Sequence, residues 1–196
     1  DVFVYDALVL RSLEARLERA FDEVRTATQA TQDPVEVEAA LEAFEEELEV
    51  PLSPVHLSSL QSANFAPQLE RDVLSLLRAV MSQPVSQTKL DDRGEFVLVR
   101  VEGSARTEET VSDPSTVHSI TTARKKLQEV AVQDLSDRVV YLRDAAAHVA
   151  ESLCHANLRL DASETAVRAE RASSAVQPVT TSYERGEVIV RSGERV

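Results

Sequence analysis

The stretch LRSLEARLERAFDEVR, residues 10–25, is the first clear secondary-structure signal in the chain, and it indicates the fold class. Its apolar side chains recur every three or four residues, and charged residues fill the positions between them. This spacing is typical of an amphipathic helix, here of about twenty residues, that buries one face. The buried face is expected to consist of Leu10, Leu13, Leu17, Phe21 and Val24.

Three further helices are predicted before residue 83. Asp33 as N-cap, Pro34 in the first turn and Glu36 closing a capping box begin the second helix. A short third helix starts at Ser53-Pro54, and a fourth follows Pro67. The apolar faces of the second and fourth helices are expected to comprise Val37, Leu41, Phe44 and Leu48, and Leu69, Val73, Leu76 and Val80, respectively.

The second helix is also rich in acid, since seven of the fourteen residues from Glu36 to Glu49 are Glu. A cation site is one interpretation of this run. We favour a solvated helix face, because the carboxylates spread around the helix instead of converging on one point.

The middle of the chain introduces β-structure. Residues 95–101, EFVLVRV, predict a strand covered on both faces, and the polar residues 102–116 predict a loop or a weak partner strand. Helix returns near Ile120. The apolar residues from Leu135 to Leu153 then predict one long amphipathic helix, too short to require a coiled coil.

The last part of the chain predicts one more helix and a hairpin. Asp161 and Glu164 form a capping box for a helix that ends near Val176. Two short strands, at about 179–183 and 187–191, follow with Gly186 at the turn between them.

Together these patterns predict a predominantly α-helical α+β fold in a single domain, residues 1–196. A helical, bundle-like lobe covers about 9–82, a β insertion about 90–116, further helices about 119–176 and a C-terminal hairpin about 177–196. The N-terminal segment, residues 95–101 and the hairpin are expected to form one small β element.

Composition excludes some functions. The net charge of −13 disfavours nucleic-acid binding and an anionic membrane surface, because both require a basic patch. A single cysteine precludes an intrachain disulfide. No apolar run approaches the length of a membrane span, and no signal peptide is visible. The chain opens on DVFVYD without Met, and we expect it to be part of a longer protein.

Candidate catalytic and metal-binding residues are few. His148 and His155 lie seven residues apart with Glu151 between them, whereas zinc ligands of the H-E-x-x-H type lie four residues apart. We therefore interpret both as solvent-facing or flanking histidines. His56 and His118 are expected to be isolated.

Other site signals are equally weak. Cys154 is expected on the apolar side of a helix, where a thiol fills the core. Asp91-Asp92 precedes Arg93-Gly94 and is interpreted as a turn rather than a metal site. The chain has no G-x-S-x-G, G-x-G-x-x-G or Walker-type motif.

The C-terminal residues carry a more specific pattern. ANLRLDASETAVRAERASSAVQPVTTSYERGEVIVRSGERV, residues 156–196, resembles the end of the extracytoplasmic domain of the seven-transmembrane HD phosphohydrolases. DVFVYDALVL, residues 1–10, is similar to that family's strand leading into a long helix, although Asp6 follows Tyr5 directly. The family-motif positions, for which a structural role is expected, are Asn157, Asp161, Thr165, Pro178, Gly186, Glu187, Ile189, Val190, Gly193 and Glu194.

The resemblance implies a bacterial cell-membrane protein. Transmembrane helices flank this domain in the family, and a cytoplasmic HD domain hydrolyses cyclic dinucleotides, cyclic di-AMP in particular, at a divalent metal pair. No His-Asp dipeptide occurs in this chain, so no catalytic residue, cofactor or metal site is carried over. The implied function is a non-catalytic sensory or regulatory domain that passes a signal across the membrane.

Two other functions stay open at this stage: a free-standing helical scaffold or adaptor without a ligand, and an enzyme that uses scattered acidic residues. For the sensory domain, the expected partner is an unknown small ligand or an extracytoplasmic protein, besides the parent's own transmembrane helices. A homodimer through the 135–153 helix is an alternative to packing within the domain. Ligand pockets are expected between the helical lobe and the β element.

Overall fold

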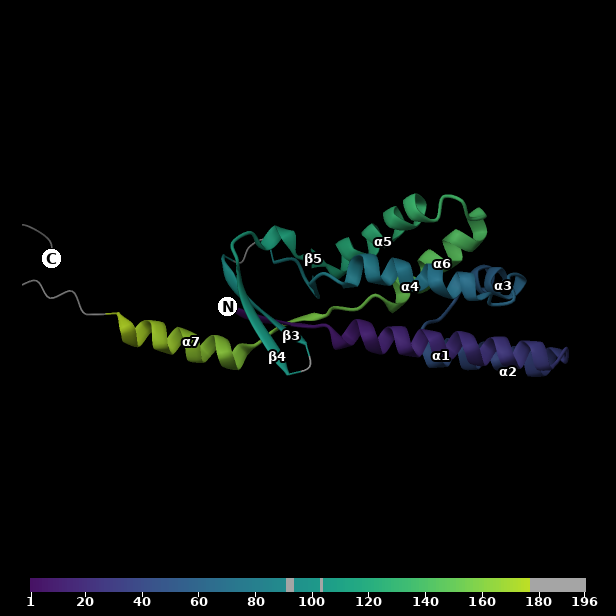
Figure 1. Ribbon diagram of the computed structural model, residues 1–196, viewed down its shortest axis with the longest axis horizontal. Coiled ribbons are helices and arrows are strands. Elements are labelled where there is room, and N and C mark those ends of the chain that lie inside the picture. Colours follow the sequence, from purple (N-terminus) through teal and green to yellow (C-terminus); the bar gives the residue numbers. More distant parts are fainter. Residues whose placement is uncertain (91–93, 103, 177–196) are drawn as a thin grey trace, which may run out of the picture. The chain divides into compact units, whose positions relative to one another are not determined.

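The structure is a computed structural model that describes residues 1–90, 94–102 and 104–176. Within them it contains seven α-helices and a six-stranded mixed sheet, which confirms a predominantly helical α+β fold (Figure 1). The chain divides into two compact units, Asp1–Asp161 and the part from Ala162 onward, and each is described by itself. The expected hairpin over 177–196 and the Asp91-Asp92 pair lie outside the described residues.

Six helices belong to the first unit. α1 packs against α2 and α4, α4 packs against α5 and α6, and α3 packs against α6. The apolar stripes predicted for α1 and α4 are buried, apart from the partly buried Leu10. The bounds of the helices are α1 (Leu8–Ala30), α2 (Pro34–Leu48), α3 (Pro54–Ser62), α4 (Pro67–Met81), α5 (Ile120–Asp134) and α6 (Val140–Leu153).

Three phenylalanines anchor the helical core. Phe21 of α1, Phe44 of α2 and Phe65, just before α4, are all buried. Their ring centroids lie 5.2 Å (Phe21–Phe44), 5.2 Å (Phe44–Phe65) and 6.1 Å (Phe21–Phe65) apart, and each pair meets edge to face. This arrangement is the favourable one for aromatic rings, and it ties together three segments that are distant in sequence.

The sheet brings the start and the middle of the chain together. Its strand order is β4-β3-β1-β6-β2-β5. β1 runs parallel to β3, with Val4 opposite Val99, and antiparallel to β6. The N-terminal segment and the strand near 95–101 therefore pair as expected. The strand bounds are β1 (Val2–Asp6), β2 (Val85–Ser86), β3 (Phe96–Glu102), β4 (Ala105–Val111), β5 (His118–Ser119) and β6 (Leu158–Leu160).

β3 contributes to a buried cluster on each face of the sheet, as predicted. Phe96 and Leu98 pack in one cluster with Phe3, whereas Val99 packs with Val2 and Val4 in another. Beside β3, residues 105–111 form the weak partner strand rather than a loop. β4 pairs antiparallel with β3 over its whole length, and its side chains are nearly all exposed.

The prediction of one long helix over 135–153 is wrong. α5 ends at Asp134 and α6 begins at Val140, and Val139 is exposed instead of buried. In the turn between them, the Arg138 guanidinium reaches Asp72 on α4, with Nε 2.8 Å from Oδ2. Hydrogen bonding to Asp72 and its charge raise the pKa of Arg138. This tertiary ion pair accompanies a chain reversal that the spacing of apolar residues does not reveal.

The second unit contains α7 (Ala162–Ala175), which begins directly after Asp161 and matches the predicted last helix. None of its residues is buried, and Arg168 pairs with Glu164 at 2.8 Å one turn away. Among the described residues, no helix combines the length and apolar character that crossing a bilayer requires.

Candidate functional site

A surface pocket lies where the segment after α2 meets α5 and α6. Its volume is about 330 Å³, and charged and polar side chains make up most of its lining. We call it the polar pocket. It is lined by Glu49, Val50, Pro51, Arg124, His148, Glu151 and Ser152.

The backbone on one side of the pocket is held by local hydrogen bonds. Glu49 adopts a left-handed conformation with φ 55° and turns the chain out of α2, and Val50 donates its N–H to the Glu45 carbonyl at 3.1 Å. The Glu45 carboxylate accepts the N–H of Leu52 at 2.5 Å. Since Val50 is also buried, the 49–52 segment is fixed in place.

The other side is built by α5 and α6. Arg124 of α5 donates from Nη2 to the Cys154 carbonyl at 3.4 Å, and Gln128 donates to Glu151 of α6 at 2.7 Å. These two contacts show that the helices run antiparallel. Alanines 123, 131, 146 and 150 are buried and small enough for α5 and α6 to approach closely.

Arg124 is the least satisfied charged group of the pocket. Its Nε is buried and has no hydrogen-bond partner, and it forms no salt bridge with any carboxylate of the described residues. Glu49, by contrast, pairs with Arg16 at 3.2 Å. Within the described part of the chain, the pocket therefore contains two carboxylates and one arginine that forms no salt bridge.

Cys154, whose carbonyl accepts the Arg124 hydrogen bond, is fully buried as predicted, although it follows α6 instead of lying on its apolar side. Burial raises the pKa of its thiol to about 11, while the charge of Arg124 lowers the pKa and that of Glu151 raises it. The thiol is therefore protonated at neutral pH and unsuited to nucleophilic chemistry.

We expect native Cys154 to react with a thiol-exchange reagent at least about a hundredfold more slowly than in the urea-unfolded chain, because the thiolate fraction falls about tenfold per unit of raised pKa. The measurement is the rate of thionitrobenzoate release at about pH 8 in buffer and in urea. Equal rates in the two solutions would contradict the burial of this thiol.

A pair of histidines borders the pocket, and the expectation that His56 is isolated is wrong. His56 of α3 stacks on His148 of α6 with ring centroids 4.1 Å apart and an interplanar angle of 27°. The Ser53 hydroxyl lies 3.0 Å from Nδ1 of His56. Burial lowers the pKa of His56, the charge of His148 lowers it further, and Asp144 opposes both. No spacing rule reveals this contact, since it joins distant segments.

Acidification is expected to destabilise the fold through this stack. Because the pKa of folded His56 is below its ordinary value of 6.5, the unfolded chain binds the proton more readily. The contribution of the neutral His56 to the free energy of unfolding is thus fully present above pH 6.5, and it is lost as the pH drops through the folded pKa. The His118 pKa is also lowered, by burial and by Lys126, and acts in the same direction.

The measurement is the melting temperature between about pH 7.5 and about pH 5.5, before most carboxylates titrate. His56→Gln is expected to reduce the pH dependence without abolishing it, since the lowered pKa of His118 acts in the same direction. His155→Gln, which removes an imidazole at an exposed position, serves as the comparison variant. An equal pH dependence in both variants would show that the stack has no such effect.

Of the family-motif positions, the structure describes Asn157, Asp161 and Thr165. Asn157 is buried between α6 and β6, Asp161 donates its N–H to the Val2 carbonyl at 2.8 Å, and Thr165 lies on α7. None of the three lines the polar pocket. Pro178, Gly186, Glu187, Ile189, Val190, Gly193 and Glu194 lie outside the described residues.

Asn157 bonds to residues 81–85 through its side-chain amide and to β1 through its backbone carbonyl. Its Oδ1 accepts the N–H of Val85 at 2.6 Å, and its Nδ2 donates to the carbonyls of Met81 at 2.8 Å and Gln83 at 3.1 Å. Its own carbonyl accepts the N–H of Asp6 at 2.9 Å. Asn157 therefore links the end of α4 to β1, β2 and β6.

A second surface feature is a groove of about 480 Å³ between α2 and α3. Val37 and Leu41, predicted to be buried, are only partly buried and line it together with Leu57. The prediction fails because, in the part of the chain that the structure describes, this end of the α2 stripe borders an open groove instead of being covered by another helix. Glu38 and Glu42 form an acidic rim, and the groove also includes Pro34, Glu45 and Gln61. We call it the acidic groove.

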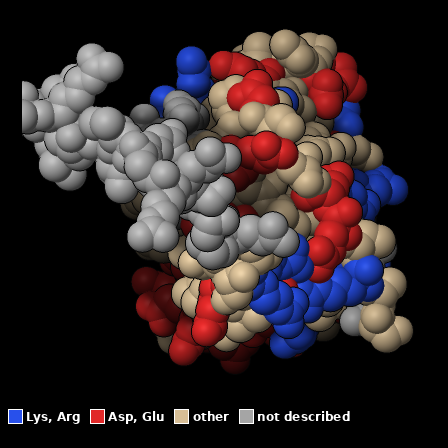
Figure 2. Space-filling view, turned by 90° about the vertical axis from the view of Figure 1, so that its left-hand side faces the viewer, with Lys and Arg blue, Asp and Glu red and all other residues tan. Residues whose placement is uncertain are grey.

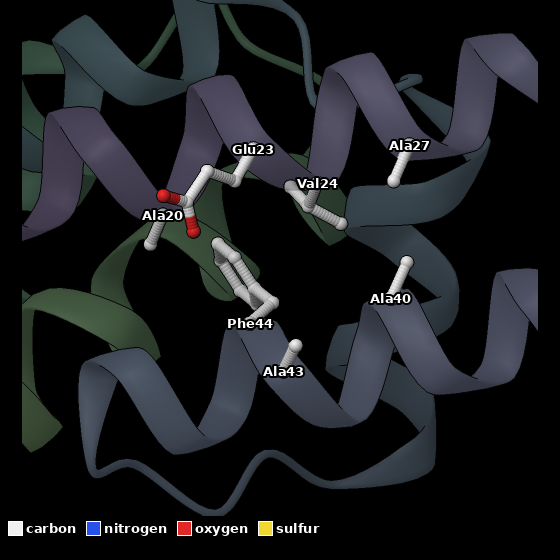
Figure 3. Close-up of a pocket in the computed structure, with 7 residues that line it drawn as sticks. All are labelled: Ala20, Glu23, Val24, Ala27, Ala40, Ala43 and Phe44. Atoms are coloured by element: carbon white, nitrogen blue, oxygen red, sulfur yellow. The ribbon is translucent and has the colours of Figure 1, made fainter.

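Figure 3 shows a smaller gap, of about 100 Å³, between α1 and α2. The methyl groups of four alanines face it (Ala20, Ala27, Ala40 and Ala43), with the Glu23 carboxylate directed toward the Phe44 ring. Because the side chains on both helices are small here, the helices pack loosely and leave this space. Figure 2 shows acidic side chains over several parts of one face with basic groups among them, so charge alone does not single out a site there.

The pockets described above lie among the helices rather than between the helical lobe and the sheet. Among the described residues, no cluster of three or more His, Cys, Asp or Glu side chains is arranged to hold a metal ion. These features define a helical α+β domain with a polar surface pocket.

Comparison with known families identifies this domain further. The family model 7TMR-HDED, described as 7TM-HD extracellular, matches residues 1–196, and the chain belongs to that family. It is therefore an extracellular domain of 7TM-HD proteins and lies on the extracytoplasmic side of a membrane. Searches of curated proteins and of solved structures found no match.

Proposed function

We propose that this domain is a non-catalytic sensor that binds a small ligand in the polar pocket and regulates a bacterial membrane protein carrying an intracellular HD hydrolase. The family match over the whole chain carries this proposal. It favours the sensor over a free-standing scaffold that shares only a hairpin with the family. Cyclic di-AMP is the proposed substrate of the parent's HD domain, with a divalent metal pair as its cofactor.

The position of the pocket supports a regulatory role. Glu151 and Ser152 lie in the last turn of α6, only a few residues before Asn157. Asn157 in turn bonds to the ends of α4 and β2, and the chain continues through β6 toward α7. A ligand that binds two arrangements of α5 and α6 with different affinity would shift their populations and move this connection.

The test uses the full-length parent in cells, with cyclic di-AMP turnover as the readout. Combined Arg124→Gln and Glu151→Gln substitutions are expected to change the turnover about fivefold or more, the usual range of allosteric coupling. Lys125→Gln, an exposed neighbour of Arg124, is the control and should leave turnover unchanged. Equal turnover in the pocket variant, in both rich and minimal medium, would refute the sensory role.

The proposal that the domain itself is non-catalytic has a separate test. The purified 196-residue chain is incubated with cyclic di-AMP and Mn²⁺, and the products are separated by chromatography. We expect no hydrolysis above the protein-free control. Turnover that scales with protein concentration would overturn this part of the proposal.

A second candidate function, protein docking, is favoured by the acidic groove. Its apolar floor and acidic rim complement a cationic amphipathic helix, which would place Leu side chains between α2 and α3 and Lys side chains against Glu38 and Glu42. A synthetic Leu/Lys helix is expected to bind the chain, and Leu41→Gln to weaken it about tenfold. A Leu/Glu helix that binds equally well would contradict this assignment.

A further inference from the structure

The polar pocket presents a guanidinium that has no carboxylate partner among the described residues. Arg124 is partly buried, its Nε has no acceptor, and its one hydrogen bond among the described residues is the 3.4 Å contact with the Cys154 carbonyl. The buried Nε itself is closed to a ligand, but the side chain lines the pocket and forms no salt bridge among the described residues, although the chain has a large excess of carboxylates. An arginine left open in a pocket is suited to a carboxylate or phosphate on a ligand.

The remaining charges of the pocket select among anions. Glu151 and Glu49 line the same space, so a doubly charged phosphate would meet two carboxylates. A ligand that binds Arg124 through a single carboxylate has less negative charge than phosphate, so the two glutamates repel it less. The Glu151 carboxylate is held through Oε2 by Gln128, which leaves its other oxygen available for a positively charged group of the same ligand.

The size and remaining lining of the pocket are consistent with a small molecule. Its volume of about 330 Å³ is near the lower end for small-ligand sites. Val50, Pro51 and the ring of His148 provide its apolar and aromatic lining. A ligand with a carboxylate, an ammonium group and a short side chain matches these three parts.

We propose that the polar pocket binds an α-amino acid, with the ligand carboxylate on Arg124 and its ammonium group on Glu151. The biological meaning of this binding rests on the proposed sensory function, whereas the binding itself does not. Both charged contacts are required, which distinguishes this site from a simple anion site.

The test is a thermal-shift screen of the purified chain against the twenty L-amino acids, followed by calorimetric titration of those that stabilise it. We expect at least one to bind with a Kd below about 1 mM. Three control compounds are each expected to bind at least about tenfold more weakly. They are the amide of this amino acid, which lacks the carboxylate, the deaminated acid, which lacks the ammonium group, and inorganic phosphate.

Substitutions in the pocket then assign the contacts. Arg124→Gln and Glu151→Gln are each expected to weaken binding about tenfold to a hundredfold. Lys125→Gln and Glu129→Gln remove the same charges from an exposed pair on α5 and are expected to have no effect. If Arg124→Gln lowers the melting temperature without ligand, Arg124→Lys replaces it, and the same weakening is expected because Lys lacks the guanidinium fork.

Three results would overturn the inference: no amino acid binds, phosphate or the deaminated acid binds as tightly as the amino acid, or binding is unchanged in the Arg124 and Glu151 variants. The sensory function fails separately. Amino-acid binding without any change in the parent's turnover would contradict the sensor and leave the site assignment intact. Altered turnover in the pocket variants without amino-acid binding would contradict the site assignment and leave the sensory function intact.

Discussion

Replacing Asn157 with alanine is expected to lower the free energy of unfolding by about 2–4 kcal/mol. The substitution removes two buried hydrogen bonds, to Val85 and Met81, and a partly buried one to Gln83. The Val85 N–H is then left without its side-chain acceptor, and an unsatisfied buried donor accounts for much of the loss. The Met81 carbonyl still accepts a hydrogen bond from the Tyr5 hydroxyl at 3.4 Å, which limits the loss at this carbonyl oxygen.

The measurement is urea unfolding of the purified chain, followed by circular dichroism. Arg159→Ala, an exposed substitution two residues further on in β6, is the control and is expected to change stability by less than about 0.5 kcal/mol. A loss below about 1 kcal/mol for Asn157→Ala would show that the linkage between α4 and the sheet does not depend on this amide.

Replacing Phe21 with alanine is expected to cost about 3–5 kcal/mol, because the ring is fully buried and leaves a cavity. The loss includes both edge-to-face contacts, with Phe44 at 5.2 Å and Phe65 at 6.1 Å. These contacts hold α1 to α2 and to the segment before α4. Their removal is therefore expected to loosen the packing of α2, whose outer face forms the acidic groove.

Thermal and urea unfolding together measure this effect. Phe21→Leu is the matched control, since it keeps most of the apolar volume and is expected to cost only about 1–2 kcal/mol. Equal losses for the two variants would mean that ring contacts add nothing beyond apolar burial. A loss near zero for Phe21→Ala would contradict the position of this ring in the core.

Much of the architecture follows from local patterns. The stripe of α1, the Asp33-Pro34 start of α2 and the return of helix at Ile120 all appear in the structure where the sequence predicts them. Periodicity and capping act within a few turns, so they are visible without the rest of the fold. The break between α5 and α6 is not visible in this way, because Arg138 reaches Asp72, which lies far from it in the sequence.

Local sequence patterns predicted much less of the candidate site than of the fold. The polar pocket joins the segment after α2 to α5 and α6, and no motif connects Glu49 with Arg124 or Glu151. The same holds for the stack of His56 on His148. Sequence spacing placed His148 and His155 together on one helix, whereas the relevant neighbour comes from α3.

The sequence by itself determined the helical α+β class, the family and the absence of an HD motif from this chain, because these depend on local periodicity and on residues in fixed order. Only the tertiary structure decided which charges meet. Among the described residues, it left Arg124 without a carboxylate partner, left Val37 and Leu41 of the α2 stripe only partly buried, and gave the Asn157 side chain three hydrogen-bond partners. The physical reason is that such contacts depend on the packing of distant segments, which local spacing does not encode.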